Sequence, residues 1–491
     1  MRLRFWRILL ALLILMVVLG TGGWLLLLRP VPQAATSDPA KLFDHGSIGN
    51  EAAQGLPYWI WRVLPKVFPD LLPGDQDGYG AFGLYWPSGD PVPVGLSVKT
   101  LGVIPRVAPN CAFCHQGSYR LAPEDPAHLV SAGPGTRVDP QSYIRFVIRA
   151  GSDPRFTSGR LMDEIAAIYD MPLWERVTYR FVLIPATRKA LQKQAITFAW
   201  MQTRPDWGPG RIDPFNPVKF QNLRLADDGT IGNSDMMPLW DMRSVAATPL
   251  RRFALHWDGL QTDLHETVVS GAIGDGMDYR SYPQAAAGLA GMETFVSRML
   301  PPTSPFSPRR PPGDPFHVDA AAVEAGRTIY VRDCAECHDA GGARTRTPIP
   351  IAELGTDRHR LDMWSPAAKE RYSAYEPGHD WGFRYFEKTD GYVAVPLTGL
   401  WLKAPYLHNG SVPSLAALLM PPAERPAVFW RGSDLVDPVS GGFVSTPGID
   451  PQRRLWRYDT AVPGNANGGH LWGTTLDPAA KAALLAYLKT L

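Results

Sequence analysis

The chain begins with an unbroken apolar run at residues 8–28. As a helix this run would span about 31 Å, close to the thickness of the hydrocarbon core of a bilayer. Three arginines precede the run and only one follows it. The charge bias predicts a cytoplasmic stub at 1–7 and a single-pass inner-membrane anchor at 8–28, with the rest of the chain in the periplasm. A cleaved signal peptide is the alternative, although the apolar cores of signal peptides are usually shorter.

Breaks in periodicity divide the exported part. Residues 29–56 lack a sustained apolar period and predict a linker. Residues 301–315 contain seven prolines in fifteen positions, which neither a helix nor an inner strand tolerates. The pattern therefore predicts an N-terminal domain at 57–300 and a C-terminal domain at 316–491.

Helical patterns dominate within both halves. Asp139, Asp319 and Asp477 each stand where an N-cap is expected, directly before a helical period. Gly151 is expected to end the first of these helices, and Pro185 to separate two more. The predicted helices are 141–150, 320–332, 479–491 and two within 172–202. Few stretches alternate between apolar and polar residues, so the predicted fold class is mainly α with long loops.

Composition narrows the function classes. The 491 residues include 49 basic and 47 acidic side chains, and a net charge of +2 argues against a nucleic-acid partner. Proline (48) and glycine (46) are abundant and indicate irregular structure, whereas 16 Trp, 17 Tyr and 19 Phe argue against disorder.

All four cysteines fall in two copies of one motif, C-x-x-C-H, which is the attachment pattern of c-type haem. Two thiols one helical turn apart can form thioethers to one porphyrin edge, and the adjacent histidine can then bind the iron. A disulfide, a redox dithiol and half of a zinc site are the alternatives. A dithiol does not need a histidine after each second cysteine, and the usual zinc-finger spacing is missing. We therefore expect two covalent haems c, bound through Cys111, Cys114 and His115 and through Cys334, Cys337 and His338.

The second half has the pattern of a small cytochrome c domain. Gly326 and Tyr330 share one face of the helix that precedes Cys334. We expect this helix to cross the C-terminal helix, where Leu484 and Tyr487 offer a partner face.

Three further histidines have contexts that suit a haem site. His256 precedes a Trp-Asp-Gly triplet, while His408 and His470 lie in turns rich in Gly and Asn that let the backbone approach a flat cofactor. Met420 is a competing axial ligand for the second iron, because methionine is common in electron-carrying cytochromes. The histidines with weaker contexts are His45, His128, His265, His317, His359 and His379.

The two C-x-x-C-H motifs, with HWDG between them and APYLHNGSVPSL after the second, resemble the bacterial di-haem cytochrome c peroxidase and MauG superfamily. GYGAFGLYWPSGDPVPVG and GNANGGHLWGTTL are most similar to its rubber-oxygenase-like branch. The resemblance covers about residues 57–491.

The resemblance implies a role for each site. The His115 haem would be reactive, with an open or labile sixth position, and the His338 haem would be six-coordinate and relay electrons. Trp257 matches the tryptophan between the two haems, and His470 matches the distal ligand of the second. His408 would lie near this second haem without binding its iron.

One departure concerns proton transfer. The peroxidases carry a glutamate about twenty residues after that tryptophan, and it moves a proton during O–O cleavage. In this chain the position is Met277, flanked by Asp275 and Asp278. Either an aspartate such as Asp275 substitutes for the glutamate, or the protein does not cleave peroxide in the usual way. Asp275, with His256 and Trp257, completes the predicted catalytic residues. A structural calcium ion between the haem domains is also expected, without a supporting motif.

Two functions remain open at this point. The first is an oxidoreductase that activates hydrogen peroxide or dioxygen at the first haem and passes electrons through the second. The alternative is a non-enzymatic di-haem electron carrier. Both would exchange electrons with a periplasmic donor or acceptor.

Overall fold

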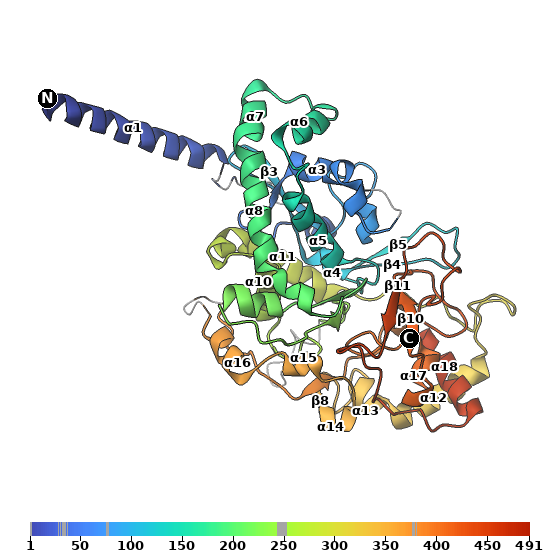
Figure 1. Ribbon diagram of the computed structural model, residues 1–491. Helices are drawn as coiled ribbons and strands as arrows, with labels where there is room; N and C mark the ends of the chain where they lie inside the picture. Colours follow the sequence, from blue (N-terminus) through green and yellow to red (C-terminus); the bar gives the residue numbers. More distant parts are fainter. Residues whose placement is uncertain are drawn as a thin grey trace.

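The computed structural model describes residues 2–27, 29, 31, 36, 38–74, 78–242, 253–375, 379 and 381–491. It shows a body of short helices, small sheets and long loops, from which one helix projects (Figure 1). The fold is mixed, with 43% helix and 11% strand, rather than mainly α as expected. The strands are only two to six residues long, and so short an element gives almost no alternating pattern.

The projecting helix is α1, Arg2–Leu27. Its stretch Arg4–Gly23 is long and apolar enough to cross a membrane, and none of it is buried in the body. The predicted anchor at 8–28 coincides with this helix, except that residue 28 lies outside the described residues. Length and composition fit a membrane span and a signal sequence alike.

The segment after α1 contradicts the prediction of a linker up to residue 56. Residues Pro39–His45 form α2, capped by the Asp38 side chain, and Phe43 of this helix is fully buried. Ile48 and Asn50 are also fully buried. A seven-residue helix with one buried side chain is too short to show a period, which is why the sequence pattern missed it.

The first half is built on a three-stranded antiparallel sheet in the order β1-β3-β2. Its strands are Leu56–Pro57, Ile104–Pro109 and Leu96–Leu101. Helices α3 (Tyr58–Val67), α5 (Pro140–Ser152), α6 (Ser158–Ala166) and α8 (Ile184–Thr197) form the part of the body around α7 (Leu173–Thr178) in Figure 1. A hairpin of β4 (Gln116–Tyr119) and β5 (His128–Ser131) follows the first haem motif.

Two predicted helix boundaries in this half are shifted by a few residues. Helix α5 ends at Ser152 rather than at Gly151, and the glycine allows close packing, since a Cβ there would sit 2.3 Å from the Leu191 Cβ of the crossing helix α8. The two helices predicted within 172–202 are α7 (Leu173–Thr178) and α8. A π turn, η3 (Tyr179–Leu183), joins them, and Pro185 lies at the start of α8.

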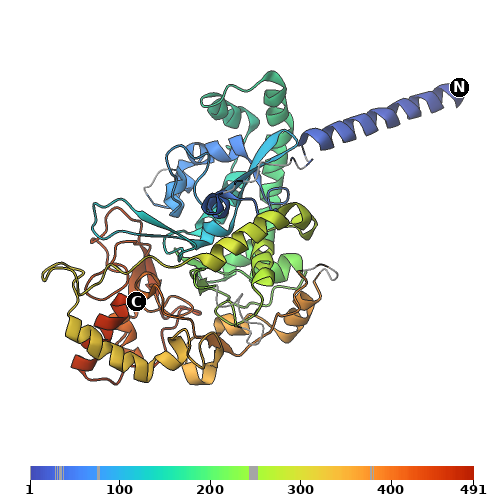
Figure 2. The same cartoon turned by 180° about the vertical axis from the view of Figure 1, so that it is seen from behind.

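The second half confirms both helices predicted around the second haem motif. Helix α12 (Ala320–Asp333) is capped by Asp319, and α18 (Pro478–Thr490) by Asp477. The two helices pack together at one end of the body, as Figure 2 shows from behind. At their crossing the rings of Tyr330 and Tyr487 are in contact, with centres 5.2 Å apart and planes tilted by 50°, and Gly326 faces the α18 backbone.

Small elements complete this half and the connection between the halves. The helices are α10 (Leu264–Gly274), α11 (Tyr282–Arg298), α13 (Ala335–His338), α14 (Ile351–Leu354), α15 (His359–Asp362), α16 (Pro366–Ser373) and α17 (Leu415–Leu418). The antiparallel pairs are β6 (Arg211–Ile212) with β7 (Ser234–Asp235), β8 (Pro348–Pro350) with β9 (Gly391–Val393), and β10 (Val428–Arg431) with β11 (Trp456–Asp459). Residues 301–315 are irregular, as their prolines predicted.

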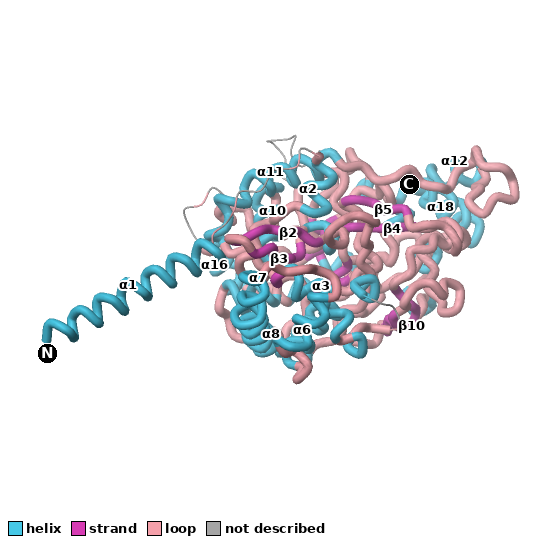
Figure 3. The backbone as a smooth tube through the Cα atoms, turned by 90° about the horizontal axis from the view of Figure 1, so that it is seen from above, coloured by secondary structure: helices cyan, strands magenta, loops and turns pink. Residues whose placement is uncertain are grey.

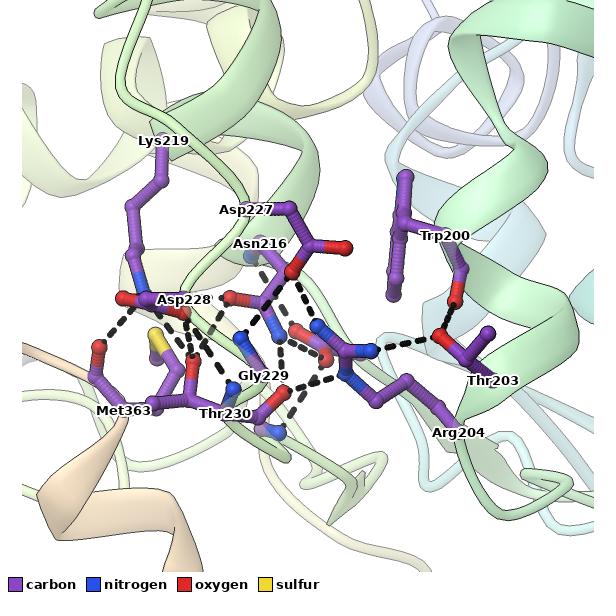
Figure 4. Close-up of polar contacts among 12 residues, drawn as sticks. Trp200, Thr203, Arg204, Asn216, Lys219, Asp227, Asp228, Gly229, Thr230 and Met363 are labelled. Atoms are coloured by element: carbon purple, nitrogen blue, oxygen red, sulfur yellow. Dashed lines mark hydrogen bonds and ion pairs between the residues drawn. The ribbon is translucent and has the colours of Figure 1, made fainter.

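The halves are joined by shared packing and by buried polar groups. One core cluster combines Phe215 and Leu260 of the first half with Trp364 of the second. Lys219 donates to the Met363 carbonyl, within the polar network of Figure 4. The side chains of the two halves therefore pack against one another. Their division into domains at 57–300 and 316–491 stays a prediction.

A buried ion cluster joins the halves at a second place, and we call it the clasp. The Arg120 side chain, fully buried at the end of β4, pairs with Asp434 and Asp450 of the second half. The backbone joins there too, since Arg120 N donates to the Asp434 carbonyl and Val436 N to the Arg120 carbonyl.

Candidate functional site

The first haem motif forms a single helical turn, α4 (Cys111–His115), which the side chain of Asn110 caps. Asn110 is fully buried and also donates to the Phe43 carbonyl, so the predicted linker supports this site. The His115 Nδ1 lies 2.8 Å from the Met237 carbonyl oxygen. If Nδ1 carries the proton, Nε2 is free to bind a metal. Burial lowers the pKa of His115 to about 4 and so favours the neutral imidazole that binds iron.

The second motif has the same local design. Cys334 ends α12, and the turn α13 (Ala335–His338) presents the histidine. The His338 Nδ1 lies 2.8 Å from the Val395 carbonyl oxygen. Gly342 lets the following loop pass close to α13, because a Cβ there would lie 2.4 Å from the Ala335 carbonyl oxygen. Each predicted proximal histidine is thus oriented by a distant backbone carbonyl.

None of the four cysteines forms a disulfide with another. Burial raises the pKa of Cys111 to about 12 and that of Cys334 to about 11. A redox-active dithiol needs a lowered thiol pKa, so these environments do not suit one. Among the described residues, no cluster of three or more His, Cys, Asp or Glu side chains has the arrangement of a metal-ion site, so the expected calcium ion stays a prediction.

The structure places His470 opposite His338, with their ring centres 6.3 Å apart. A metal-bound imidazole nitrogen lies about 2 Å from the metal and the ring centre about 1 Å further, so two imidazoles on opposite faces of one iron have centres roughly 6 Å apart. The observed spacing fits one iron between the rings. Burial, and then the charge of His338, lower the pKa of His470 to about 4, and its Nδ1 is buried without a hydrogen-bond partner.

The loop that carries His470 is held by a buried arginine. Arg425 is 4% exposed, and its guanidinium donates to the carbonyls of Asn467 (2.6 Å), Gly469 (2.9 Å) and His470 (3.1 Å). Gly469 has φ +72°, and a Cβ there would lie 2.3 Å from the Leu354 carbonyl oxygen. The glycine and the arginine therefore fix the path of the backbone that presents the imidazole.

The first motif has a different surrounding. Among the described residues, no second histidine ring faces His115 in the way that His470 faces His338. His256 lies close enough for its charge to lower the pKa of His115, but its Nε2 interacts with Gln261 Oε1 at 3.2 Å. His256 also has a positive φ of 63°, which aims its side chain from an unusual backbone conformation.

Trp257 connects the two segments that orient the proximal histidines. Its indole Nε1 donates to the Asp235 carbonyl at 2.8 Å, two residues before Met237. Its own carbonyl accepts from Val393 N at 2.8 Å, two residues before Val395. The tryptophan therefore links the two segments whose carbonyls orient His115 and His338.

Asp275 lies near the first motif. It ends α10, and its charge acts on the Cys111 and Cys114 thiols, raising their pKa values. Burial raises the pKa of Asp275 to about 7. Met277, at the position of the missing glutamate, is instead packed in the core, and Asp278 caps the short helix η6 (Tyr279–Ser281).

The remaining candidates occupy other positions. The His408 ring stacks on Tyr392 with centres 3.7 Å apart, and its Nε2 is buried without a hydrogen-bond partner. Met420 is 38% exposed at the surface, which disfavours it as an axial ligand. His265 bonds to Glu293 and Tyr282, and His359 to Asp357, so both are held by protein groups.

Sequence reasoning missed three groups of this site: the carbonyls of Met237 and Val395, and the side chain of Arg425. Any residue type supplies a carbonyl, so no sequence signal marks the first two. The Arg425 signal was weak, since one arginine between two prolines resembles an ordinary surface loop.

Comparisons with known proteins match part of this site. A family model described as RoxA-like, cytochrome c-like matches residues 391–431, a segment that includes Val395, His408 and Arg425. This match supports the rubber-oxygenase-like cytochrome c branch, implies haem c binding and is consistent with an oxidoreductase.

Two curated relatives come from Sinorhizobium fredii (strain NBRC 101917 / NGR234). Uncharacterized protein y4iJ is 46% identical over 109 residues, which cover 20% of this chain and 18% of that protein. Uncharacterized protein y4iM is 33% identical over 190 residues, covering 33% of this chain and 43% of that protein. The chain thus matches less than half of the length of either relative.

Proposed function

We propose that the chain is a di-haem c-type oxidoreductase that activates dioxygen or hydrogen peroxide at the His115 site and exchanges electrons through the His338 site. The observation that carries the proposal is the asymmetry of the two motifs. His338 has a second imidazole, that of His470, at the spacing of a shared iron, whereas no described histidine faces His115 in this way. In an electron carrier, protein ligands occupy the sixth coordination position of both irons. An enzyme that activates a small oxidant needs this position free on one of them.

The haems, when bound, supply iron that changes its oxidation state and that can bind a small oxidant where a coordination position is free. The surrounding residues then have separate tasks. Asp275, with its pKa raised to about 7, can hold or release a proton beside the first site at neutral pH. Trp257 links the segments of both proximal histidines and offers an aromatic ring for electron transfer between the sites.

Paramagnetic resonance of the oxidised protein, produced with a cytochrome c maturation system, tests the proposal. Mass spectrometry of the denatured chain should first show two haems. The spectrum should then contain one high-spin and one low-spin ferric signal. Two low-spin signals would favour the alternative, a di-haem electron carrier.

Replacement of His470 tests the assignment of the closed site. His470→Ala should convert the low-spin signal to high-spin, because the iron loses its sixth ligand. His128→Ala, at an exposed position on β5, is the control and should leave both signals unchanged. An unaltered His470→Ala spectrum would exclude His470 and favour Met420.

We infer a location at the inner membrane with the haem sites in the periplasm. Besides α1, a strip of apolar side chains on α7 and η3 supports a membrane surface, since Leu173, Val177 and Phe181 are exposed. Helix α7 lies on the side of the body from which α1 departs (Figures 1 and 3). Gly102 N donates to the Arg29 carbonyl and so ties the end of the anchor to the β2–β3 hairpin. Recovery of soluble mature protein that begins near residue 35 would show instead that the run is cleaved.

A further inference from the structure

One arginine near the two haem sites has no partner for its charge. Arg211 begins β6, pairs through its backbone with Asp235 of β7, and is 0% exposed. Its Nε, Nη1 and Nη2 atoms all lack a hydrogen-bond partner among the described residues. The ring of Tyr458 lies beneath the guanidinium, 5.0 Å from the ring centre to Cζ.

A buried cation without a partner strongly destabilises a fold, and protein interiors normally supply an anion or a set of carbonyls for it. Two neighbouring arginines follow this rule. Arg431 pairs with Asp235, and Arg360 pairs with Asp258. The charges of Asp235 and Asp357 act on Arg211, but neither carboxylate forms an ion pair with it among the described contacts. The partner of Arg211 is therefore expected from outside the chain.

Arg211 lies between the segments that orient the two proximal histidines. On one side its strand partner is Asp235, two residues before the Met237 carbonyl that holds the first of them. On the other side the charge of Arg211 acts on His408. The ring of His408 stacks on Tyr392, and that strand leads to the carbonyl that holds the second histidine.

The cofactor implied by each motif carries two carboxylates on its porphyrin edge. A guanidinium can bind a carboxylate through two parallel hydrogen bonds, and such a pair is strongest where water is excluded. We propose that Arg211 binds a propionate carboxylate of a haem through its guanidinium. The inference rests on the haem loading proposed above, and it adds a cofactor-binding residue that the haem motifs do not reveal.

Redox titration of the loaded protein tests the assignment with Arg211→Gln and Arg211→Lys. A cation beside a haem favours its reduced state, so Arg211→Gln should shift the midpoint potential of one haem to a more negative value. Arg211→Lys keeps the positive charge, so its midpoint potential should stay close to that of the wild type. A shift of the high-spin haem assigns the carboxylate to the His115 site, and a shift of the low-spin haem assigns it to the His338 site.

The control is Arg327→Gln, which removes an exposed arginine paired with Glu324 and should change neither potential. Unchanged potentials in a fully loaded Arg211→Gln protein would overturn the inference. A wild-type protein that carries no haem after production with a cytochrome c maturation system would instead refute the proposed function.

If Arg211→Gln does not accumulate, an experimental structure of the haem-loaded wild-type protein tests whether Arg211 contacts a propionate. A guanidinium nitrogen within hydrogen-bond distance of a propionate oxygen supports the assignment. A guanidinium that pairs with Asp357 or another carboxylate of the chain overturns it.

Discussion

The carboxyl group of Asp275 makes a contribution to stability that depends on pH. Burial raises its pKa from 3.8 to about 7. Because the folded state holds this proton more tightly than the unfolded chain, the contribution of Asp275 to stability is greatest below about pH 4 and is lost as pH rises through 7. Asp275→Asn removes this dependence.

The variant should therefore be more stable than the wild type at pH 8, by on the order of 1–4 kcal/mol, and little changed at pH 4. Urea unfolding at both pH values measures the difference. Asp170→Asn, at a fully exposed position, serves as the control. An equal effect of Asp275→Asn at both pH values would contradict the raised pKa.

Arg425 positions His470 by holding the backbone of its loop. Arg425→Met removes the donors that hold the carbonyls of Asn467, Gly469 and His470, so the loop should present the imidazole less firmly. We expect part of the low-spin haem to become high-spin, and added imidazole to restore it. Optical titration with imidazole measures both effects. Arg457→Met, at an exposed arginine on β11, should behave as the wild type.

At the scale of elements, the crossing of α12 and α18 depends on the absence of a side chain at residue 326. A Cβ on Gly326 would lie 2.0 Å from the Ala483 carbonyl oxygen, so the helices must separate to admit it. Gly326→Ala should destabilise the protein by about 1–3 kcal/mol. The matched control is Gly271→Ala in α10, where a Cβ meets no atom within 4 Å, and it should stabilise by about 0.4–1 kcal/mol. Thermal unfolding of both variants distinguishes close packing from helix propensity.

The elements also show what local sequence could predict. The N-caps at Asp319 and Asp477 specify helices because the capping side chain and the backbone it satisfies are three residues apart. The haem motifs are equally local. The role of Arg425 could not be assigned, because the carbonyls that it holds in the His470 loop are more than forty residues away and their positions depend on the whole fold. The π turn before Pro185 was missed for a related reason, since packing rather than composition permits it.

For the whole molecule, the clasp makes the two halves depend on one another. Asp434 is fully buried and accepts from Arg120 and Ser118. Asp434→Asn removes one of the two negative charges that neutralise the buried Arg120 guanidinium. The free energy of unfolding should therefore fall by about 3–5 kcal/mol at pH 7. Unfolding of both halves should shift together, which separate fluorescence and haem absorbance probes can follow.

Acid weakens the stabilisation that Asp434 contributes to the clasp. The Asp434 carboxyl is buried, but Arg137 and then Arg453 hold its pKa at about 2, below the value of 3.8 in an unfolded chain. Its stabilisation is therefore present above about pH 4 and is lost as pH falls towards 2. Asp434→Asn should remove this acid-sensitive contribution. Asp459→Asn, which breaks an exposed pair, should change stability by less than about 1 kcal/mol.

The clasp also imposes an order of events during biogenesis. Arg120 follows the first haem motif by five residues, yet its partner Asp434 lies 314 residues further along the chain. Under the proposed export from the N-terminus, Cys111 and Cys114 would therefore cross the membrane long before Asp434 does. In that interval both thiols would be available for the proposed attachment of haem. The contact that joins the two halves in the folded protein would form only after nearly the entire chain has been exported.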